Sequence, residues 1–411
     1  MNKIIGKFLS FLLFAFLLLP SCSDWLDLKP YDGVTENDYW NTKEDVYSAL
    51  IGCYSSLLNP SLVTNMIYWG ELRADILTGS SSAGSDQMNV IRGEITPENG
   101  IVKWAQFYTT INYCNKLIEK SALVRNRDLT FSDALYQQYK AEATAIRSLM
   151  YFYLVRSFSD VPFVTKASDN DQQDYQIAKT AGSAILDSLA LQMNNVINYL
   201  PVNLGNNDAN KGRITRWTGL SLLADIYLWQ ENYAGCNELC TQVINSGQFT
   251  LIPVQREIFY VLDMIGDTID MVYHFNQTDA NILFDRLYVT GNSVESIFEL
   301  QFPKTHETLT DPFFPLFNNN GRPQLAPQTA DIYESTIFPI YEDDSEVEDV
   351  RSRNFSFSSG YVWKWVGTSR MGMQRTQRQF PHWIIYRLPD ILLMKAEALT
   401  QTGIRDNDRN A

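Results

Sequence analysis

The segment that most constrains the fold of this chain runs from residue 141 to residue 165 and reads AEATAIRSLMYFYLVRSFSDVPFVT. Its apolar residues recur at steps of three and four, the period of one helix face: Ala143, Ile146, Leu149, Met150, Tyr153, Leu154 and Phe158. Val161-Pro162 ends the helix, because the residue before a proline is disfavoured in the helical region. A helix of this length cannot bury such a face alone, so the sequence predicts a helical scaffold that covers it.

Residues 1–21 have the features of a lipoprotein signal peptide. Two lysines supply positive charge, and the nearly all apolar run from Phe8 to Leu19 is too short to span a bilayer. The sequence Leu-Pro-Ser-Cys that ends at Cys22 resembles the cleavage box of bacterial lipoproteins, in which acyl chains are attached to the cysteine. Several acyl chains on Cys22 are enough for stable anchoring. A plain secretory signal with an incidental cysteine is the alternative.

The charge balance restricts the partners of the chain. It has 47 acidic and 33 basic side chains, a formal net charge of −14 at pH 7. We expect no nucleic-acid partner, because phosphate binding needs a basic stripe. Aromatic residues make up 13% of the chain, which leaves two interpretations open: core filling, or rings that stack on ligands.

Helical periodicity, capping residues and proline or glycine stops recur along the rest of the chain. They assign a helical scaffold to about 40–58, 102–247 and 386–401. Within 213–247, small and aromatic residues stand at the spacing that locks two antiparallel helices in tetratricopeptide repeats. We therefore predict a mostly α fold of tetratricopeptide-like helix pairs, packed against a loop-rich region with a few short strands. Residues 22–411 form one domain in this prediction.

The stretches of about 59–101 and 250–385 lack a helical period, and we expect them to be irregular and to hold the ligand site. The first contains a Gly/Ser-rich loop. In the second, residues 294–302 predict a strand. The rings of residues 361, 363 and 365 alternate and would share one face of another strand, which is either core or a stacking platform.

The cysteines after the signal are expected to be buried thiols. Cys236 and Cys240 lie four residues apart on a predicted helix, where their side chains are poorly aimed for a disulfide. The three histidines lie too far along the chain to complete a zinc site. The acid cluster at 342–349 lacks the glycine and spacing of a calcium loop, which favours a solvated turn. We expect no metal site and no cofactor.

Four segments together resemble the SusD/RagB family of outer-membrane lipoproteins from Bacteroidetes. They are the lipoprotein box with its CSDWLDLKP tail, the segment 141–165, GRITRWTGLSLLADIYLW and YRLPDILLMKAEAL. One position departs from the family pattern: Ser159 stands where the family commonly has glycine, a change that bears on the turn after the helix. Family members usually run on past the last of these segments, so we expect the sequence to be truncated at its C-terminus.

The resemblance implies a nutrient-binding lipoprotein held in the outer membrane by Cys22 and facing the cell exterior. Such proteins capture glycans, or peptides in some members, and deliver them to a SusC-like TonB-dependent transporter. The resemblance implies no enzyme activity. Sugars stack on aromatic rings and accept hydrogen bonds from amides and arginine. The candidate ligand-binding residues on these grounds are Trp69, Arg73, Asp75, Trp363 and Trp365.

Two other functions stay open. An exported glycoside hydrolase would need two carboxylates about 5 to 9 Å apart in a cleft, and with 47 acidic residues some pair will always be found. The sequence contains no Gly-x-Ser-x-Gly elbow and no His-Glu-x-x-His motif. The second alternative is a scaffold that binds only protein.

Overall fold

The computed structural model describes residues 39–74, 76–168, 176–262, 264–302, 311–327, 340–342, 345–347, 350–351, 355–376 and 381–403. The predicted signal peptide, Cys22 and Asp75 lie outside these ranges, as does most of the acid cluster at 342–349. The chain divides into two units, Met1–Asn41 and Thr42–Ala411, and the second unit holds all the elements discussed below.

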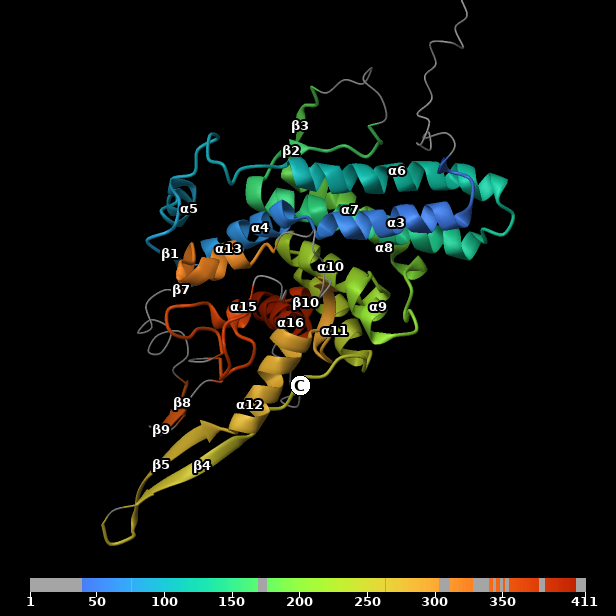
Figure 1. The fold of residues 1–411 in the computed structure, drawn as a ribbon. Helices are drawn as coiled ribbons and strands as arrows, with labels where there is room; N and C mark the ends of the chain where they lie inside the picture. The colour runs from blue at the N-terminus through green and yellow to red at the C-terminus, as the bar shows by residue number, and fades with distance from the viewer. Residues whose placement is uncertain are drawn as a thin grey trace, which may run out of the picture. The chain divides into compact units, whose positions relative to one another are not determined.

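The second unit is mostly helical, as predicted (Figure 1). The described helices and helical turns are α3 (Lys43–Leu57), α4 (Pro60–Trp69), η2 (Glu71–Arg73), α5 (Ser85–Ile91), α6 (Ala105–Arg127), α7 (Asp133–Phe158), α8 (Gly182–Val196), η3 (Ile197–Tyr199), α9 (Asn207–Gly212), α10 (Arg216–Trp229), α11 (Tyr233–Asn245), α12 (Gln277–Phe284), η4 (Asp285–Thr290), α13 (Phe314–Phe317), η5 (Asn319–Gly321), α15 (Trp363–Val366) and α16 (Leu388–Thr402). Within the described ranges, no helix has both the length and the apolar content needed to cross a bilayer.

The described strands form small sheets. They are β1 (Leu77–Gly79), β2 (Val161–Pro162), β3 (Lys179–Thr180), β4 (Arg256–Leu262), β5 (Thr268–Phe275), β6 (Ser296–Leu300), β7 (Leu325–Pro327), β8 (Ile340–Glu342), β9 (Ser345–Val347) and β10 (Trp383–Arg387). β1 pairs with β7, β2 with β3, and β6 with β10, each antiparallel, and the fourth sheet has the order β4-β5-β9-β8. β6 confirms the strand predicted at 294–302.

Helix α7 lies at the centre of the helical part and packs against α3, α6 and α8. It contains the segment from which the sequence predicted one buried face. More than one face of α7 is buried: every residue from Ala141 to Phe152 is buried, on all sides of the helix. A helix buried all round is a core helix, and its polar residues therefore need internal partners.

The buried Glu142 of α7 shows how such partners are supplied. Its carboxylate accepts two hydrogen bonds from the Arg213 guanidinium, at 3.1 and 2.7 Å, and one from the Tyr54 hydroxyl at 2.7 Å. The Tyr54 oxygen in turn accepts the backbone N–H of Ile214 at 2.9 Å. This network ties α3, α7 and the entry to α10 together, so it fixes the packing of the helical scaffold.

The region 59–101 is more regular than predicted. Pro60 stands in the first turn of α4, and the side-chain oxygen of Asn59 caps this helix by accepting the N–H of Ser61 at 2.9 Å. The prediction of irregular structure is wrong for α4 and α5. The pair Asn59-Pro60 ends α3, as expected, but the same pair also starts the next helix.

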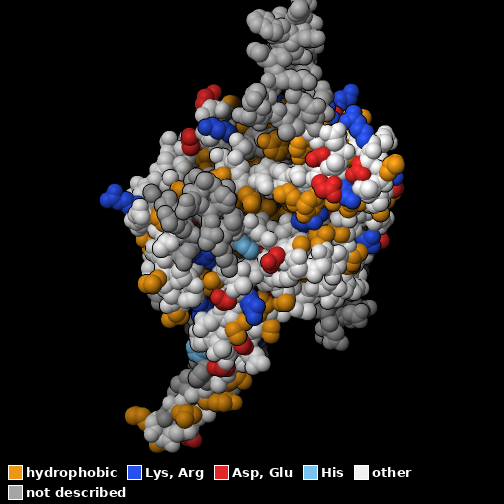
Figure 2. Space-filling model, turned by 45° about the vertical axis from the view of Figure 1, so that its right-hand side comes forward, with side chains coloured by type: hydrophobic (Ala, Val, Ile, Leu, Met, Phe, Trp, Pro, Cys, Tyr) orange, Lys and Arg blue, Asp and Glu red, His pale blue; other side chains and the backbone are white. Residues whose placement is uncertain are grey.

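The region 250–385 contains a long hairpin, β4–β5, and helix α12, neither of which the sequence analysis predicted. Figure 2 shows hydrophobic side chains gathered along this hairpin. Its exposed large apolar residues are Ile258, Tyr260, Leu262, Met264 and Ile265.

The cysteine prediction is confirmed for the four described cysteines. Cys53, Cys114, Cys236 and Cys240 are free and buried. The sulfur atoms of Cys236 and Cys240 lie 3.9 Å apart in α11, beyond a disulfide bond length.

Candidate functional site

A hollow of about 460 Å³ lies beside α4, where the helical scaffold meets the irregular region. We call it the α4 hollow. Its polar lining comes from four separate parts of the chain: Ser61, Thr64, Asn65, Tyr68, Lys103, Gln106, Asp311 and Gln324. Ligand sites in proteins favour such junctions between substructures.

Hydrogen bonds hold the polar groups of the α4 hollow in place. The Tyr68 hydroxyl accepts from Gln87 Nε2 at 2.9 Å and donates to Gln324 Oε1 at 3.4 Å. Gln87 Nε2 also donates to Gln324 Oε1 at 3.0 Å, and Asn65 donates to the Lys103 carbonyl at 3.0 Å. Burial raises the pKa of Tyr68, so its hydroxyl keeps its proton at physiological pH. The hollow therefore presents fixed amide and hydroxyl groups, which suit a ligand rich in hydroxyls.

Asp311 is the acidic group of the hollow. It is 5% exposed, and its Oδ1 accepts the backbone N–H groups of Phe313 at 2.8 Å and Phe314 at 3.1 Å. Burial raises the pKa of this carboxyl to about 6. Among the described residues that line the hollow, Asp311 is the only carboxylate, whereas most glycoside hydrolases use a pair.

The structure places Trp69 in a supporting position beside the hollow. Its indole stacks on Phe107 at 4.6 Å between ring centres and meets Phe158 edge-on at 4.8 Å. Its Nε1 donates to the carbonyl of Ile101 at 3.1 Å, and Ile101 lines the hollow. Arg73 is exposed in η2, and Asp75 lies outside the described residues.

The prediction of a strand at 361–365 is wrong, and so is the stacking platform built on it. Trp363–Val366 forms the one-turn helix α15, in which residues two apart point about 200° away from each other. Trp363 and Trp365 are 7% and 4% exposed. Trp365 stacks on Phe313 at 5.3 Å and on Trp383 at 5.1 Å, so these rings form core rather than a ligand surface.

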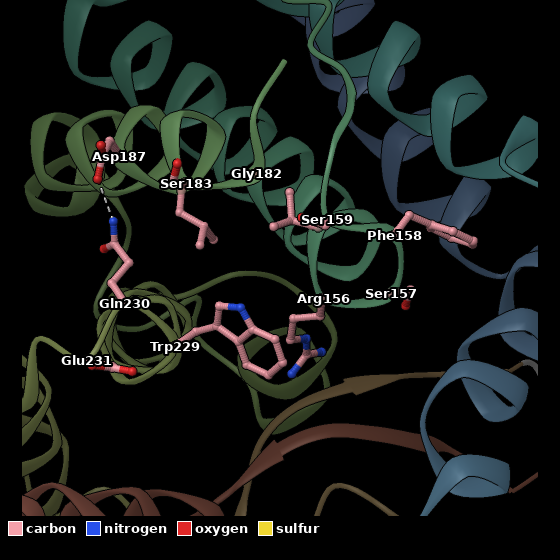
Figure 3. A pocket seen from close by; sticks show the side chains of 12 residues that line it. Arg156, Ser157, Phe158, Ser159, Gly182, Ser183, Asp187, Trp229, Gln230 and Glu231 are labelled. Atoms are coloured by element: carbon pink, nitrogen blue, oxygen red, sulfur yellow. Dashed lines mark hydrogen bonds between the residues drawn. The ribbon is translucent and has the colours of Figure 1, made fainter. Parts of the chain in front are cut away.

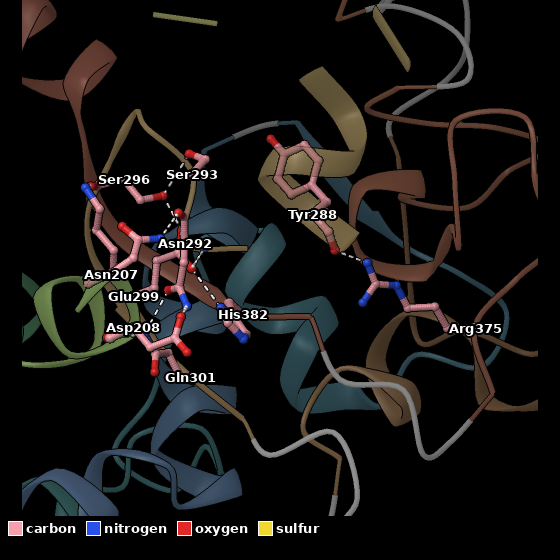
Figure 4. A network of polar contacts seen from close by, with 11 residues as sticks. Asn207, Asp208, Tyr288, Asn292, Ser293, Ser296, Glu299, Gln301, Arg375 and His382 are labelled. Atoms are coloured by element: carbon pink, nitrogen blue, oxygen red, sulfur yellow. Dashed lines mark hydrogen bonds and ion pairs between the residues drawn. The ribbon is translucent and has the colours of Figure 1, made fainter. Parts of the chain in front are cut away.

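A second polar cluster surrounds the buried Glu299 of β6 (Figure 4). Its carboxylate accepts the N–H of Asn292 at 2.8 Å and the hydroxyl of Ser296, and it lies 2.8 Å from His382 Nδ1. Serine, histidine and a carboxylate meet here, but the carboxylate stands between the other two. A hydrolytic triad needs the histidine in that middle position, so this geometry favours a structural role.

The sequence analysis missed Tyr68, Gln87 and Gln324. Tyr68 directly precedes the predicted Trp69, but the missed helix α4 hid which of the two side chains faces the hollow. The two glutamines are 237 positions apart, and neither stands in a motif. Only the tertiary fold brings them together.

The fold and the hollow define a mostly helical protein with a preformed cavity lined by hydrogen-bonding groups. Residues 24–228 match the SusD-like family described as "Starch-binding associating with outer membrane". The chain belongs to the SusD-like family, which confirms the resemblance given above.

The similar proteins include SusD-like protein P38 of Formosa agariphila, 24% identical over 98% of this chain and 80% of the relative. SusD-like protein P2 of the same organism is 25% identical over 56% of this chain and 44% of the relative.

Among solved structures, a SusD superfamily protein of Bacteroides thetaiotaomicron aligns with a TM-score of 0.64 and 22% identity, covering 89% of this chain and 78% of that one. Surface glycan-binding protein A of that species, in complex with laminarihexaose, aligns with a TM-score of 0.63 and 18% identity, covering 90% and 80%. At these identities the structures support the fold.

Proposed function

We propose that this protein is an outer-membrane lipoprotein that binds glycan nutrients and delivers them to a SusC-like TonB-dependent transporter. The observation that carries the proposal is membership in a family described as starch-binding and outer-membrane associated. The structural neighbour solved with laminarihexaose supports a glycan as the ligand. The lipid anchor at Cys22, the exterior orientation and the transporter partner belong to the proposal through the family resemblance.

We assign the ligand to the α4 hollow. Its fixed amides and hydroxyls can exchange hydrogen bonds with sugar hydroxyls without first reorganising. Arg73 and Asp75 remain proposed ligand contacts, and Trp69 positions the wall of the hollow through its hydrogen bond to the carbonyl of Ile101. A binding role needs no catalytic pair of carboxylates, which agrees with the single carboxylate of the lining.

Isothermal titration calorimetry tests the proposal. The protein is titrated with maltohexaose, laminarihexaose, other hexasaccharides and a mixed peptide pool. We expect saturable binding of at least one glycan, and a loss of about tenfold in affinity for Gln324→Ala, which removes an amide from the hollow. Gln248→Ala, an exposed glutamine outside the hollow, is the matched control and should bind as the wild type does.

Three results would contradict the proposal. If no glycan gives binding heat, glycans are not the ligand class. If only peptides bind, the protein functions like the peptide-binding members of the family. Chromatographic detection of shortened glycan after incubation would show an enzyme instead of a binder.

A further inference from the structure

A groove of about 700 Å³ lies between the end of α7, the start of α8 and the end of α10 (Figure 3). We call it the Trp229 groove. The polar and aromatic side chains of its lining include Arg156, Ser183, Asp187, Trp229, Gln230 and Glu231. It shares no lining residue with the α4 hollow.

Trp229 gives this groove an exposed aromatic face. It is the last residue of α10 and is 53% exposed, and no other tryptophan in the described ranges is exposed. Its ring meets Phe152 of α7 edge-on, with 6.4 Å between ring centres and an angle of 89°. A half-exposed indole that packs against a buried ring can offer a stacking surface to a ligand.

The polar groups around the ring are also held in place. Gln230 Nε2 donates to Asp187 Oδ1 at 2.7 Å, which joins the end of α10 to α8, as the dashed line in Figure 3 shows. The Arg156 guanidinium lies 4.4 Å from the ring centre of Phe152 and pairs with Asp225 at 3.5 Å. In Figure 3, Arg156 lies beside the Trp229 ring, whereas Phe158 points away from it.

The charges of the groove restrict its ligand. The positive charge of Arg156 is already balanced by Asp225, which also accepts the Tyr386 hydroxyl at 2.8 Å. Asp187 and Glu231 add negative charge at the rim. An anionic ligand would be repelled here, whereas a neutral sugar can stack on the indole and hydrogen-bond to the amide, carboxylates and hydroxyls.

We propose that the Trp229 groove is a second binding site, separate from the α4 hollow, for the pyranose units of a neutral polysaccharide. The inference rests on the proposed function and extends it to a second point of attachment. Two weak sites on one protein hold a long chain more tightly than either does alone, since binding at one raises the effective concentration at the other.

The test uses the full chain labelled with 5-fluorotryptophan and followed by ¹⁹F NMR. The resonance that is absent from the spectrum of Trp229→Phe is assigned to Trp229. On titration with maltohexaose or laminarihexaose, we expect this resonance to shift and saturate, both in the wild type and in Gln324→Ala, where the α4 hollow is weakened. Dextran sulfate, a polyanion, should leave the resonance unmoved.

A matched pair of variants measures the contribution of the groove to polymer binding. In affinity gel electrophoresis with amylose or laminarin, Trp229→Ala should weaken retention about tenfold. Tyr199→Ala removes another exposed ring, outside the groove, and should change retention less than twofold. Trp229→Phe, which retains a ring, should recover most of the loss and also shows that the effect is not one of folding.

The two proposals fail in distinguishable ways. If a hexasaccharide binds in calorimetry but the Trp229 resonance does not shift, the proposal of a second site in the Trp229 groove is wrong. The proposed function is not affected by that result. A shift with dextran sulfate overturns the assignment of a neutral ligand. If no glycan gives binding heat in calorimetry, the proposed function is wrong. The proposal of a glycan site in the Trp229 groove is then wrong as well.

Discussion

Replacing Asp311 by asparagine should stabilise this protein at neutral pH. Asp311 is almost fully buried, and burial is the largest influence on its pKa, which rises from an ordinary 3.8 to about 6. An asparagine oxygen can still accept the N–H groups of Phe313 and Phe314, so the turn before α13 keeps its hydrogen bonds. The substitution removes the buried charge and little else.

The size and sign of the effect follow from proton linkage. Each tenfold change in proton affinity is worth about 1.4 kcal/mol, so the raised pKa corresponds to about 3 kcal/mol. Between about pH 4 and pH 6 the folded state keeps a proton that the unfolded chain has lost, so stability falls as the pH rises through this window. Relative to the wild type, Asp311→Asn should gain close to nothing at pH 4 and about 3 kcal/mol at pH 7.5.

Urea unfolding of both proteins across this pH range measures the difference directly. Asp128→Asn is the matched control, because the less buried Asp128 carboxylate also accepts backbone N–H groups, from Lys43 at 2.9 Å and Thr130 at 2.8 Å. Hydrogen bonds from Thr130 and Lys43 lower its pKa, so this variant should lose stability at neutral pH and recover it in acid.

The reasoning about Asp311 would be refuted by a stability difference that does not change between pH 4 and pH 7.5. A gain of equal size at both ends would mean that packing, and not charge, controls the effect. A loss at pH 7.5 would mean that the attraction of the ionised Asp311 to Arg375 exceeds the penalty of burial.

Two further predictions concern the turn after α7 and the anchor. Ser159 has φ 63° and ψ −90°, a backbone conformation that L side chains rarely adopt. Ser159→Gly should therefore raise the free energy of unfolding by about 1 kcal/mol in the same urea titration. Ser159→Ala retains Cβ and should give no gain. Cys22→Ala should move the protein from the membrane to the soluble fraction while its circular dichroism stays unchanged, and an unchanged membrane pool would contradict the anchor.

The fold was predictable where one local signal dominated. The three- and four-residue spacing after Ala141 marked α7. Capping residues marked other helix starts; Thr215, whose hydroxyl accepts the N–H of Thr218 at 3.4 Å, caps α10. Helix α4 was missed because residues 59–101 were assigned to irregular structure on their turn formers, although its segment, PSLVTNMIYW, is itself apolar. In α15, three alternating rings suggested a strand, but burial among Phe313 and Trp383 decided the conformation.

The candidate sites were less predictable than the fold, because they combine residues that the sequence does not connect. Gln324 reaches the α4 hollow from a segment far beyond α4. Trp229 was likewise not singled out, and its 53% exposure becomes visible only in the fold.

The exit from α7 explains why the sequence reveals the family more readily than the ligand. After Ser159 the chain is pinned by side chains of the scaffold: the Tyr108 hydroxyl donates to the Pro162 carbonyl at 2.7 Å, and the Tyr151 hydroxyl donates to the Val164 carbonyl at 2.8 Å. These contacts hold the end of α7, whose Phe158 packs on Trp69 beside the α4 hollow and whose last turn lines the Trp229 groove. The exit segment therefore supports the walls of both proposed sites, whereas several residues that our proposals place against the ligand, such as Gln324 and Trp229, lie outside it.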